Sequence, residues 1–199
     1  EAIAKALKKH NVPAGFFLTG DFLRDKENSK FIKTIQKKHF IGPHSDKHLL
    51  YANWNNRDSS LISASTFTAD LEANYGALAM FGIKKQEAAI FLPSYEWYND
   101  DVVRWSKKMG LQVINYTPGL RTPADYTYPE MGNRYMSSDA ILKSLYDSEG
   151  KHSLNGNIML LHMGTNATRT DKLYDRLEEI IVRLKALGYD FVRVDKIIK

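Results

Sequence analysis

The chain contains no cysteine among its 199 residues, so it can form no disulfide. This fits a protein of the reducing cytosol and equally an envelope protein without disulfides, so the absence does not separate the two compartments. No apolar run approaches the roughly 20 residues that a membrane-spanning helix needs. No charged-then-apolar signal segment opens the chain either. We therefore expect no transmembrane segment in this chain.

The sequence also lacks a Ser-, Gly- or Pro-rich linker, an internal repeat and any low-complexity segment. With 43% hydrophobic residues, the chain is long enough to bury a substantial core. We interpret residues 1–199 as one domain.

The net charge of +5 comes mainly from lysines on predicted helices. In an ordinary domain such lysines form solvated outer faces. The basic residues are not interleaved with aromatic ones, as they are in a groove that binds a nucleic-acid strand. We therefore expect no nucleic-acid partner.

Short apolar runs alternate with segments of helical periodicity, and most of the runs end in polar, Gly or Pro residues. The strand-like runs are 14–18, 40–41, 88–92, 112–115, 158–161 and, as a closing strand, 191–194. The helical segments are 1–9, 28–38, 66–81, 100–109, 137–148 and 171–187. This order predicts an α/β fold with right-handed crossovers and a parallel sheet. A barrel is favoured over an open sheet, because polar residues occur at five successive strand ends rather than around one crevice.

Two long irregular segments, 49–65 and 117–136, interrupt this alternation. Loops of such length in a compact domain are usually functional or disordered. Their aromatic content argues against disorder and favours walls of a binding cleft.

The most informative motif is Gly-Pro-His-Ser-Asp-Lys-His at residues 42–48, directly after an apolar run. It places His44 and His48 four residues apart with a carboxylate between them, which is the composition of a metal site. Asp46 has two open interpretations: a ligand or a contact to a ligand, or a solvated loop carboxylate. Asp21, after another run, is interpreted as a helix cap or as a stand-in base.

Four segments occur in the order of a known family: Phe-Phe-Leu-Thr-Gly at 16–20, His-Ser-Asp-Lys-His at 44–48, Phe-Leu-Pro-Ser-Tyr at 91–95 and Leu-Leu-His at 160–162. With helices between them, they resemble the polysaccharide deacetylases with the NodB homology domain, the family-four carbohydrate esterases. The resemblance covers nearly the whole chain. It implies a distorted (β/α)7 barrel of the NodB type, whose first strand is absent from this chain.

The resemblance also implies the site. His44 and His48 correspond to ligands of a divalent metal, most often zinc. The backbone N–H of Tyr95 corresponds to the oxyanion hole and His162 to the general acid, with Asp125 as the carboxylate that keeps His162 protonated. The family's Asp-Asp motif, which supplies the base and a third ligand, would lie upstream of residue 1.

Two positions depart from the family pattern. Leu92 stands where the family has an arginine that steadies the base, and Arg121 is a candidate replacement from a neighbouring loop. Tyr126 stands where the family has a tryptophan. The substrate-binding residues that we expect are aromatic side chains on which sugar rings stack, together with that arginine: Trp54, Trp97, Tyr98, Tyr128 and Arg121.

The resemblance therefore implies metal-dependent hydrolysis of N- or O-linked acetyl groups on a polysaccharide or oligosaccharide. The alternative is a carbohydrate-binding module of the same fold that has lost its catalytic base. Because such enzymes usually act on envelope or extracellular glycans, the resemblance also implies an extracytoplasmic protein.

Overall fold

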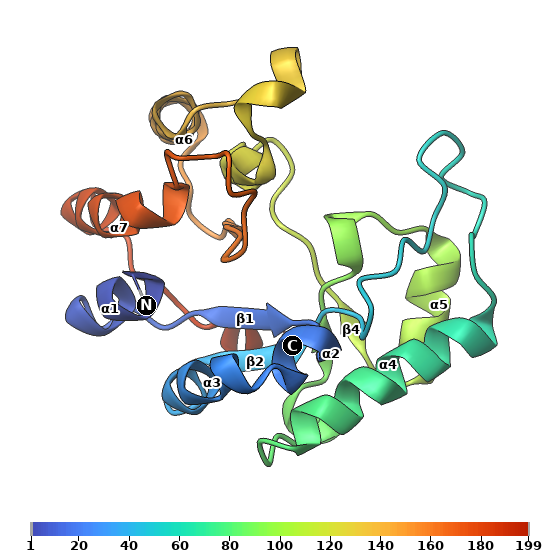
Figure 1. Ribbon diagram of the computed structural model, residues 1–199. Helices are drawn as coiled ribbons and strands as arrows, with labels where there is room; N and C mark the ends of the chain where they lie inside the picture. The colour runs from blue at the N-terminus through green and yellow to red at the C-terminus, as the bar shows by residue number, and fades with distance from the viewer. Residues whose placement is uncertain (1, 199) are drawn as a thin grey trace. The chain divides into compact units, whose positions relative to one another are not determined.

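The computed structural model describes residues 2–198 (Figure 1). The chain forms two compact units. One comprises Tyr116–Val192 with the residues up to Val12, and the other comprises Pro13–Asn115 with the residues from Arg193 onward. The interpretation of residues 1–199 as one domain stays a prediction.

The unit around Pro13–Asn115 is built on parallel strands. Strand β1 (Gly15–Leu18) pairs with β2 (Phe40–Pro43), and β3 (Ile90–Phe91) pairs with β4 (Gln112–Val113), both in parallel. The N–H of Leu92 also donates to the carbonyl of Pro43 at 3.4 Å, next to both β2 and β3. The predicted α/β character with parallel strands is confirmed.

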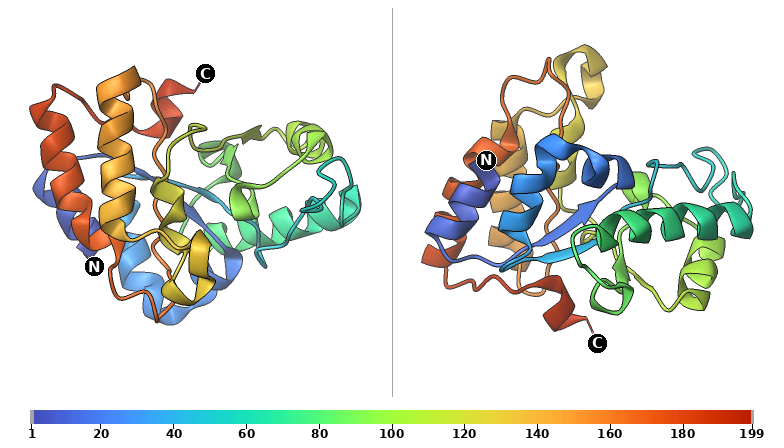
Figure 2. Two further views of the ribbon diagram at one scale, coloured as in Figure 1. Left: turned by 90° about the horizontal axis from the view of Figure 1, so that it is seen from above. Right: turned by 60° about the horizontal axis from the view of Figure 1, so that its bottom comes forward.

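Helices separate these strands along the chain. They are α2 (Gly20–Arg24), η1 (Lys26–Asn28), α3 (Ser29–Ile35), α4 (Ala64–Ala79), η2 (Lys85–Glu87), η3 (Ser94–Glu96) and α5 (Asp100–Lys108), and α8 (Val194–Ile197) follows the last strand. Side-chain caps start the two longest helices, because Ser63 accepts a hydrogen bond from the N–H of Thr66 and Asn99 accepts one from Val102. Helices α4 and α5 lie side by side, as Figures 1 and 2 show.

Helix α4 turns one face into the core of this unit. Its buried residues include Phe67, Leu71 and Leu78, and the ring of Phe67 packs edge-on against Phe91 of β3 with centroids 5.9 Å apart. Burying these side chains removes apolar surface from water, which is the main stabilising contribution to such a layer.

The other unit is helical in the residues described. It holds α1 (Ala2–Lys9), η4 (Thr122–Tyr126), η5 (Pro129–Arg134), α6 (Ser138–His152), η6 (Leu173–Arg176) and α7 (Leu177–Ala186). Its core contains Ile141 and Leu145 of α6 together with Ile180 and Leu184 of α7. Among residues 2–198, no helix is long and apolar enough to cross a membrane.

Two predicted strands are wrong. Residues 158–161 form no strand, although the N–H of Thr117 donates to the carbonyl of Ile158 at 3.0 Å. The run 191–194 ends instead in the short helix α8, where Arg193 binds the carboxylate of Asp195 through two hydrogen bonds of 2.6 and 2.8 Å. A strand needs a backbone partner along its length, and hydrophobic periodicity does not encode one. The seven-stranded barrel stays a prediction.

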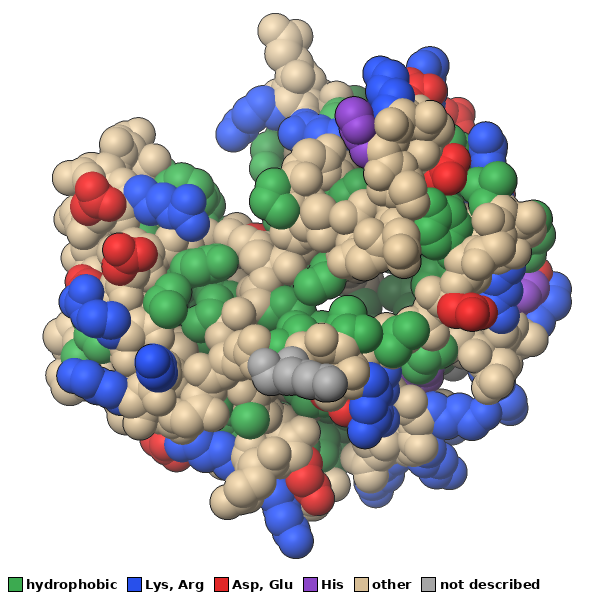
Figure 3. Space-filling view, turned by 180° about the vertical axis from the view of Figure 1, so that it is seen from behind, with side chains coloured by type: hydrophobic (Ala, Val, Ile, Leu, Met, Phe, Trp, Pro, Cys, Tyr) green, Lys and Arg blue, Asp and Glu red, His purple; other side chains and the backbone are tan. Residues whose placement is uncertain are grey.

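The exposed lysines agree with the expectation of solvated faces. Figure 3 shows Lys and Arg side chains spread over the visible face rather than gathered in one patch. The lysines of η1, α3 and the residues after it, Lys26, Lys30, Lys33 and Lys37, are exposed and form no ion pair with any described residue.

Position 20 requires glycine, because the carboxylate of Asp46 lies where a larger side chain would begin. A Cβ atom there would lie 1.8 Å from Oδ1 of the buried Asp46. We expect Gly20→Ala to lower the free energy of unfolding by about 1–3 kcal/mol, because the carboxylate must shift away from its guanidinium partner. Gly76→Ala in α4 is the control: nothing lies within 4 Å of its Cβ position, so the better helix propensity of alanine should stabilise by roughly 0.5–1 kcal/mol. Urea unfolding of both variants measures the difference, and equal effects of the two substitutions would contradict this packing.

Candidate functional site

The loop after β2 brings the two predicted metal ligands together. The ring centroids of His44 and His48 lie 5.0 Å apart, with 63° between the ring planes. Two imidazoles that bind one zinc ion through Zn–N bonds of ~2.0 Å at roughly tetrahedral angles have ring centroids about 5 Å apart. The separation of the two histidines therefore fits a shared divalent ion.

One hydrogen bond fixes the tautomer of His44. Its Nδ1 lies 2.8 Å from the backbone carbonyl of Leu92. Because a carbonyl only accepts, a neutral imidazole must carry its proton on Nδ1, which leaves the lone pair on Nε2 for a ligand. The backbone of Leu92 thus orients a candidate metal ligand, while its apolar side chain is buried. The N–H of His44 itself donates to Oδ1 of Asn74 at 3.0 Å.

The histidine loop is held in a sparsely populated backbone conformation. Ser45 has φ = 69° and His48 has φ = 54°, in the left-handed region that residues other than glycine rarely adopt. The buried carboxylate of Asp70 in α4 accepts hydrogen bonds of 3.2 Å from the N–H groups of Asp46 and Lys47. The hydroxyl of Tyr51, also buried, donates to the same carboxylate at 2.8 Å. Burial beside this carboxylate raises the pKa of Tyr51, so the phenol remains a donor.

Asp46 is not a solvated carboxylate. It is 5% exposed, and the guanidinium of Arg24 binds both of its oxygens, at 2.7 and 2.9 Å. Such a two-point pair is geometrically specific. The interpretation of Asp46 as a solvated loop residue was wrong.

Asp21 lies on the exposed side of the same cluster. The cap of α2 is Thr19, whose hydroxyl accepts from the N–H of Phe22, so the prediction of Asp21 as the capping residue was wrong. Hydrogen bonds from Lys47 and then Arg24 lower the pKa of Asp21. A lowered pKa makes a carboxylate a weaker base, so these contacts do not favour Asp21 as a stand-in base.

Replacing Asp70 tests whether this buried carboxylate positions the histidines. The asparagine side chain would present an amide N–H₂ where the carboxylate accepts, so we expect Asp70→Asn to weaken divalent-metal binding about 10–100-fold. Isothermal titration with Zn²⁺ measures the affinity, and circular dichroism confirms folding. Glu72→Gln, an exposed carboxylate of the same helix that pairs with Lys85, is the control and should bind metal as the unaltered protein does. Equal affinities of the two variants would remove Asp70 from the site.

Tyr95 follows β3 and faces His48. Its backbone is left-handed, with φ = 60° and ψ = 8°, and its ring lies 4.4 Å from the ring of His48. Among the described residues, no acceptor takes the N–H of Tyr95. A donor that the protein leaves available can stabilise negative charge on a substrate oxygen.

Three aromatic residues extend from Tyr95 over the surface of this unit. The ring of Trp54 lies 5.7 Å from Tyr95 and stacks on Trp97 at 5.4 Å and 27°. Trp54 is 53% exposed and Tyr95 45% exposed. Tyr98, the next residue along, joins them through the guanidinium of Arg57, which lies over both Trp97 and Tyr98.

The Tyr116–Val192 unit holds the second predicted group of residues. Asp125 in η4 is fully buried, and its Oδ1 lies 2.6 Å from Nδ1 of His162. Its Oδ2 accepts the backbone N–H of His162 at 2.8 Å. The carboxylate therefore orients the ring of His162 through one oxygen and the backbone through the other. The ring of Tyr126 lies edge-on to His162 at 6.0 Å.

Sequence reasoning missed Arg169 in the same unit. Its fully buried guanidinium donates to the carbonyls of Thr127 and Met136, at 2.6 and 2.9 Å, and so ties down the segment that follows Asp125. Arg121 is exposed and donates to the sulfur of Met136, and Tyr128 precedes η5.

Each unit therefore collects part of the predicted set. The Pro13–Asn115 unit brings together His44, His48, Tyr95, Trp54, Trp97 and Tyr98, and the Tyr116–Val192 unit joins Asp125 to His162. Within residues 2–198, no three or more His, Asp or Glu side chains gather into a metal cluster. The two histidines fit an ion, and the described residues do not complete its ligand set.

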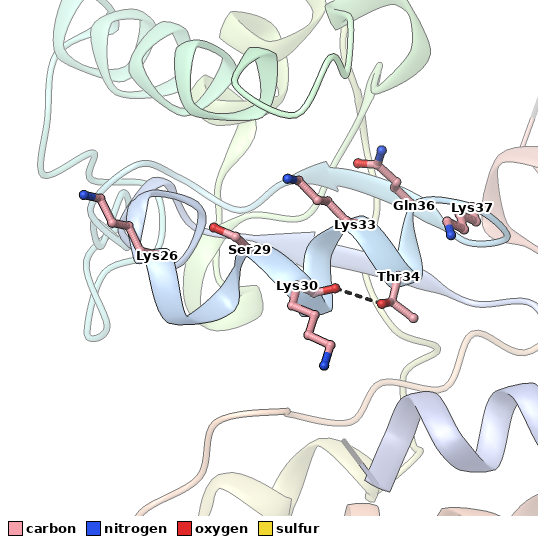
Figure 4. A pocket seen from close by; sticks show the side chains of 7 residues that line it. All are labelled: Lys26, Ser29, Lys30, Lys33, Thr34, Gln36 and Lys37. Carbon is pink, nitrogen blue, oxygen red and sulfur yellow. Dashed lines mark hydrogen bonds between the residues drawn. The ribbon is translucent and has the colours of Figure 1, made fainter.

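One surface hollow lies elsewhere. It runs along α3 and is lined by Lys26, Ser29, Lys30, Lys33, Thr34, Gln36 and Lys37 (Figure 4). Its lining includes none of the candidate residues.

A family model for polysaccharide deacetylases matches residues 1–114. The chain belongs to the polysaccharide deacetylase family.

Curated relatives and solved structures both agree with this membership. Peptidoglycan-N-acetylmuramic acid deacetylase PdaA of Bacillus subtilis is 26% identical over 196 residues, which cover 97% of this chain and 64% of PdaA. The chain spans 64% of the length of each curated relative that it matches.

Among solved structures, the fold is similar to that of a CE4 (family-four carbohydrate esterase) pseudoenzyme from Bacillus anthracis, at TM-score 0.71 and 23% identity over 98% of this chain and 58% of that one. It is also similar to a family 4 acetyl xylan esterase from Clostridium thermocellum in complex with a cobalt ion. There the TM-score is 0.74 and the identity 19%, over 98% of this chain and 81% of that one. These likenesses support the α/β fold of this family.

Proposed function

We propose that the chain is the deacetylase domain of a metal-dependent carbohydrate esterase, which hydrolyses N- or O-linked acetyl groups of a polysaccharide or oligosaccharide. The observation that carries this proposal is the histidine pair: the rings of His44 and His48 have the separation of two imidazoles on one ion, and His44 presents Nε2. Family membership supplies the substrate class.

In this proposal His44 and His48 bind the divalent ion, and zinc is the metal that we propose. A divalent ion held there would polarise the acetyl carbonyl and would lower the pKa of a bound water, so that hydroxide is available as the nucleophile near neutral pH. The N–H of Tyr95 donates to the oxyanion that develops on the carbonyl oxygen. Its left-handed backbone and its contact with His48 support this role.

His162 protonates the leaving amine or alcohol in this proposal. The two hydrogen bonds from His162 to Asp125 support the role, because a carboxylate at Nδ1 stabilises the imidazolium and leaves Nε2 to give up its proton. The proposal assigns neither the third metal ligand nor the catalytic base to a described residue. An extracytoplasmic location, as for a glycan-directed enzyme, belongs to the same proposal.

A second candidate function is carbohydrate binding without hydrolysis. It is favoured by the apolar Leu92, which stands where the family pattern has an arginine. In that case the aromatic surface around Trp54 would remain functional and the metal chemistry would not.

Acetate release separates the two candidates. The full-length protein is incubated with N-acetylated chitooligosaccharides and with acetylxylan, first as purified, then after chelation, and finally after Zn²⁺ is restored. We expect release that stops on chelation and returns with the metal. Glycan binding with no acetate under any metal condition would favour the binding module, and release that a chelator leaves unchanged would contradict the metal-dependent mechanism.

A further inference from the structure

One cation, Arg57, lies at the end of the aromatic surface that Tyr95, Trp54, Trp97 and Tyr98 form. The guanidinium carbon of Arg57 lies 4.6 Å from the ring centroid of Trp97 and 5.5 Å from that of Tyr98. Its Nε donates to the backbone carbonyl of Tyr98 at 2.6 Å. Two ring faces and one hydrogen bond therefore fix the position of an arginine that is exposed to solvent.

The charge of Arg57 is not neutralised by the protein. Arg57 forms no ion pair with any described residue, although Asp58 is its neighbour in the chain. Most arginines of this unit do pair with carboxylates, as Arg24 does with Asp46 and Arg193 does with Asp195. An unpaired guanidinium that is held in place is suited to bind an anion from solution, because its planar fork matches the two oxygens of a carboxylate.

The surface beneath Arg57 is already ordered. The indole N–H of Trp97 donates to the carbonyl of Asn53 at 3.2 Å, and Trp54 stacks on Trp97. These contacts join the segment that holds Arg57 to the segment after β3. A ligand that binds here does not have to order the loops, so less of its binding free energy is lost.

The aromatic surface is continuous with the candidate metal ligands. The ring of Tyr95 contacts His48 on one side and Trp54 on the other, and Trp97 continues from Trp54 to Arg57. An oligosaccharide whose acetyl group lies at the histidines can therefore extend over Trp54 towards Arg57. Exposed aromatic faces such as Trp54 suit the apolar face of a sugar ring.

We propose that Trp54, Arg57, Trp97 and Tyr98 form a subsite for a sugar residue that carries a carboxylate. The sugar ring lies on Trp54 and the carboxylate binds the guanidinium of Arg57. The inference rests on the proposed function in one respect, namely that the ligand is a glycan. It adds the residue that recognises an acidic sugar, Arg57; N-acetylmuramic acid, in the name of the relative PdaA, is a sugar of this kind.

Matched ligands isolate the carboxylate. We would titrate metal-free protein, for which the proposed mechanism gives no turnover, with three tetrasaccharides by isothermal calorimetry. The first is the fully N-acetylated chitotetraose, which is neutral. The second alternates N-acetylglucosamine with N-acetylmuramic acid, whose lactyl ether carries a carboxylate. The third is the methyl ester of the second. The acid and the ester differ in charge and little in shape. We expect the acid to bind about tenfold more tightly than the ester, as one hydrogen-bonded charge pair allows.

Two variants assign the difference to Arg57. In Arg57→Gln the acid should bind as weakly as the ester, while the affinity for the ester stays within twofold of its original value. Lys33→Gln, which removes one exposed and unpaired cation from α3, should leave all three affinities unchanged. Equal binding of acid and ester to the unaltered protein would overturn the proposal. So would an Arg57→Gln variant that loses affinity for both ligands equally, because Arg57 would then only support Trp97.

Acetate release from the same ligands is measured separately. Absence of release with the acid preference intact would refute the deacetylase and leave the acidic subsite standing. Release without any acid preference would refute the subsite alone.

Discussion

Replacing both His44 and His48 with alanine is expected to abolish stoichiometric Zn²⁺ binding and to reduce acetate release at least about 10³-fold, because no group of three or more His, Asp or Glu side chains among the described residues offers another site. The imidazoles stand at the end of β2, and their exchange leaves the buried contacts of Asp46 and Asp70 in place. Metal content is measured by atomic emission after dialysis, and turnover by released acetate.

The control for the double variant is His152→Ala. His152 is an exposed residue at the end of α6, in the unit that does not hold the histidine loop. It should keep both metal and activity. A folded double variant that retains one metal ion per chain and normal turnover would contradict the assignment of both histidines.

Asp125→Asn is expected to lower kcat about 10²–10⁴-fold, as for the loss of general acid catalysis, while leaving metal affinity within twofold. The carboxylate accepts two N–H groups of His162, whereas an amide offers one acceptor and places its own N–H₂ against the other donor. The amide also carries no charge to stabilise the imidazolium. Steady-state kinetics and a metal titration on the same preparation test both parts.

Asp139→Asn serves as the matched control for Asp125. Asp139 lies in the same unit, pairs with Arg176 and is almost fully exposed. Its replacement should change neither kcat nor metal affinity. If Asp125→Asn is folded and keeps its kcat within twofold, His162 is not the general acid that we propose.

The helices could largely be predicted from the sequence because their signals are local. The pattern over 66–81 predicts the helix that the structure places at Ala64–Ala79, and Ser63 sets its start through a side-chain hydrogen bond. The runs 158–161 and 191–194 look like strands in the same way, yet each lacks a ladder of backbone partners in the described residues. Strand formation depends on such partners, which lie far apart in sequence.

In the candidate site, too, the local features could be predicted from the sequence, whereas the partners far apart in the chain could not. The histidines that approach each other could be predicted because they lie four residues apart, and the hydrogen bond of Asp125 to His162 agrees with the pairing that the family resemblance implies. Asp70 and Asn74 were missed, because polar residues on a helix usually face water. The signal was present: both lie on the stripe of α4 that also carries Phe67 and Leu71. A polar residue on an apolar stripe needs a partner, and here the partner is the backbone of the histidine loop.

Anomalous diffraction at the zinc absorption edge tests the central claim most directly. Crystals of the full-length protein grown with Zn²⁺ are measured on both sides of the edge. The account predicts one strong peak ~2.0–2.1 Å from Nε2 of His44 and from a ring nitrogen of His48. A strong peak elsewhere in the protein, or both histidines without a peak at saturating zinc, would contradict it.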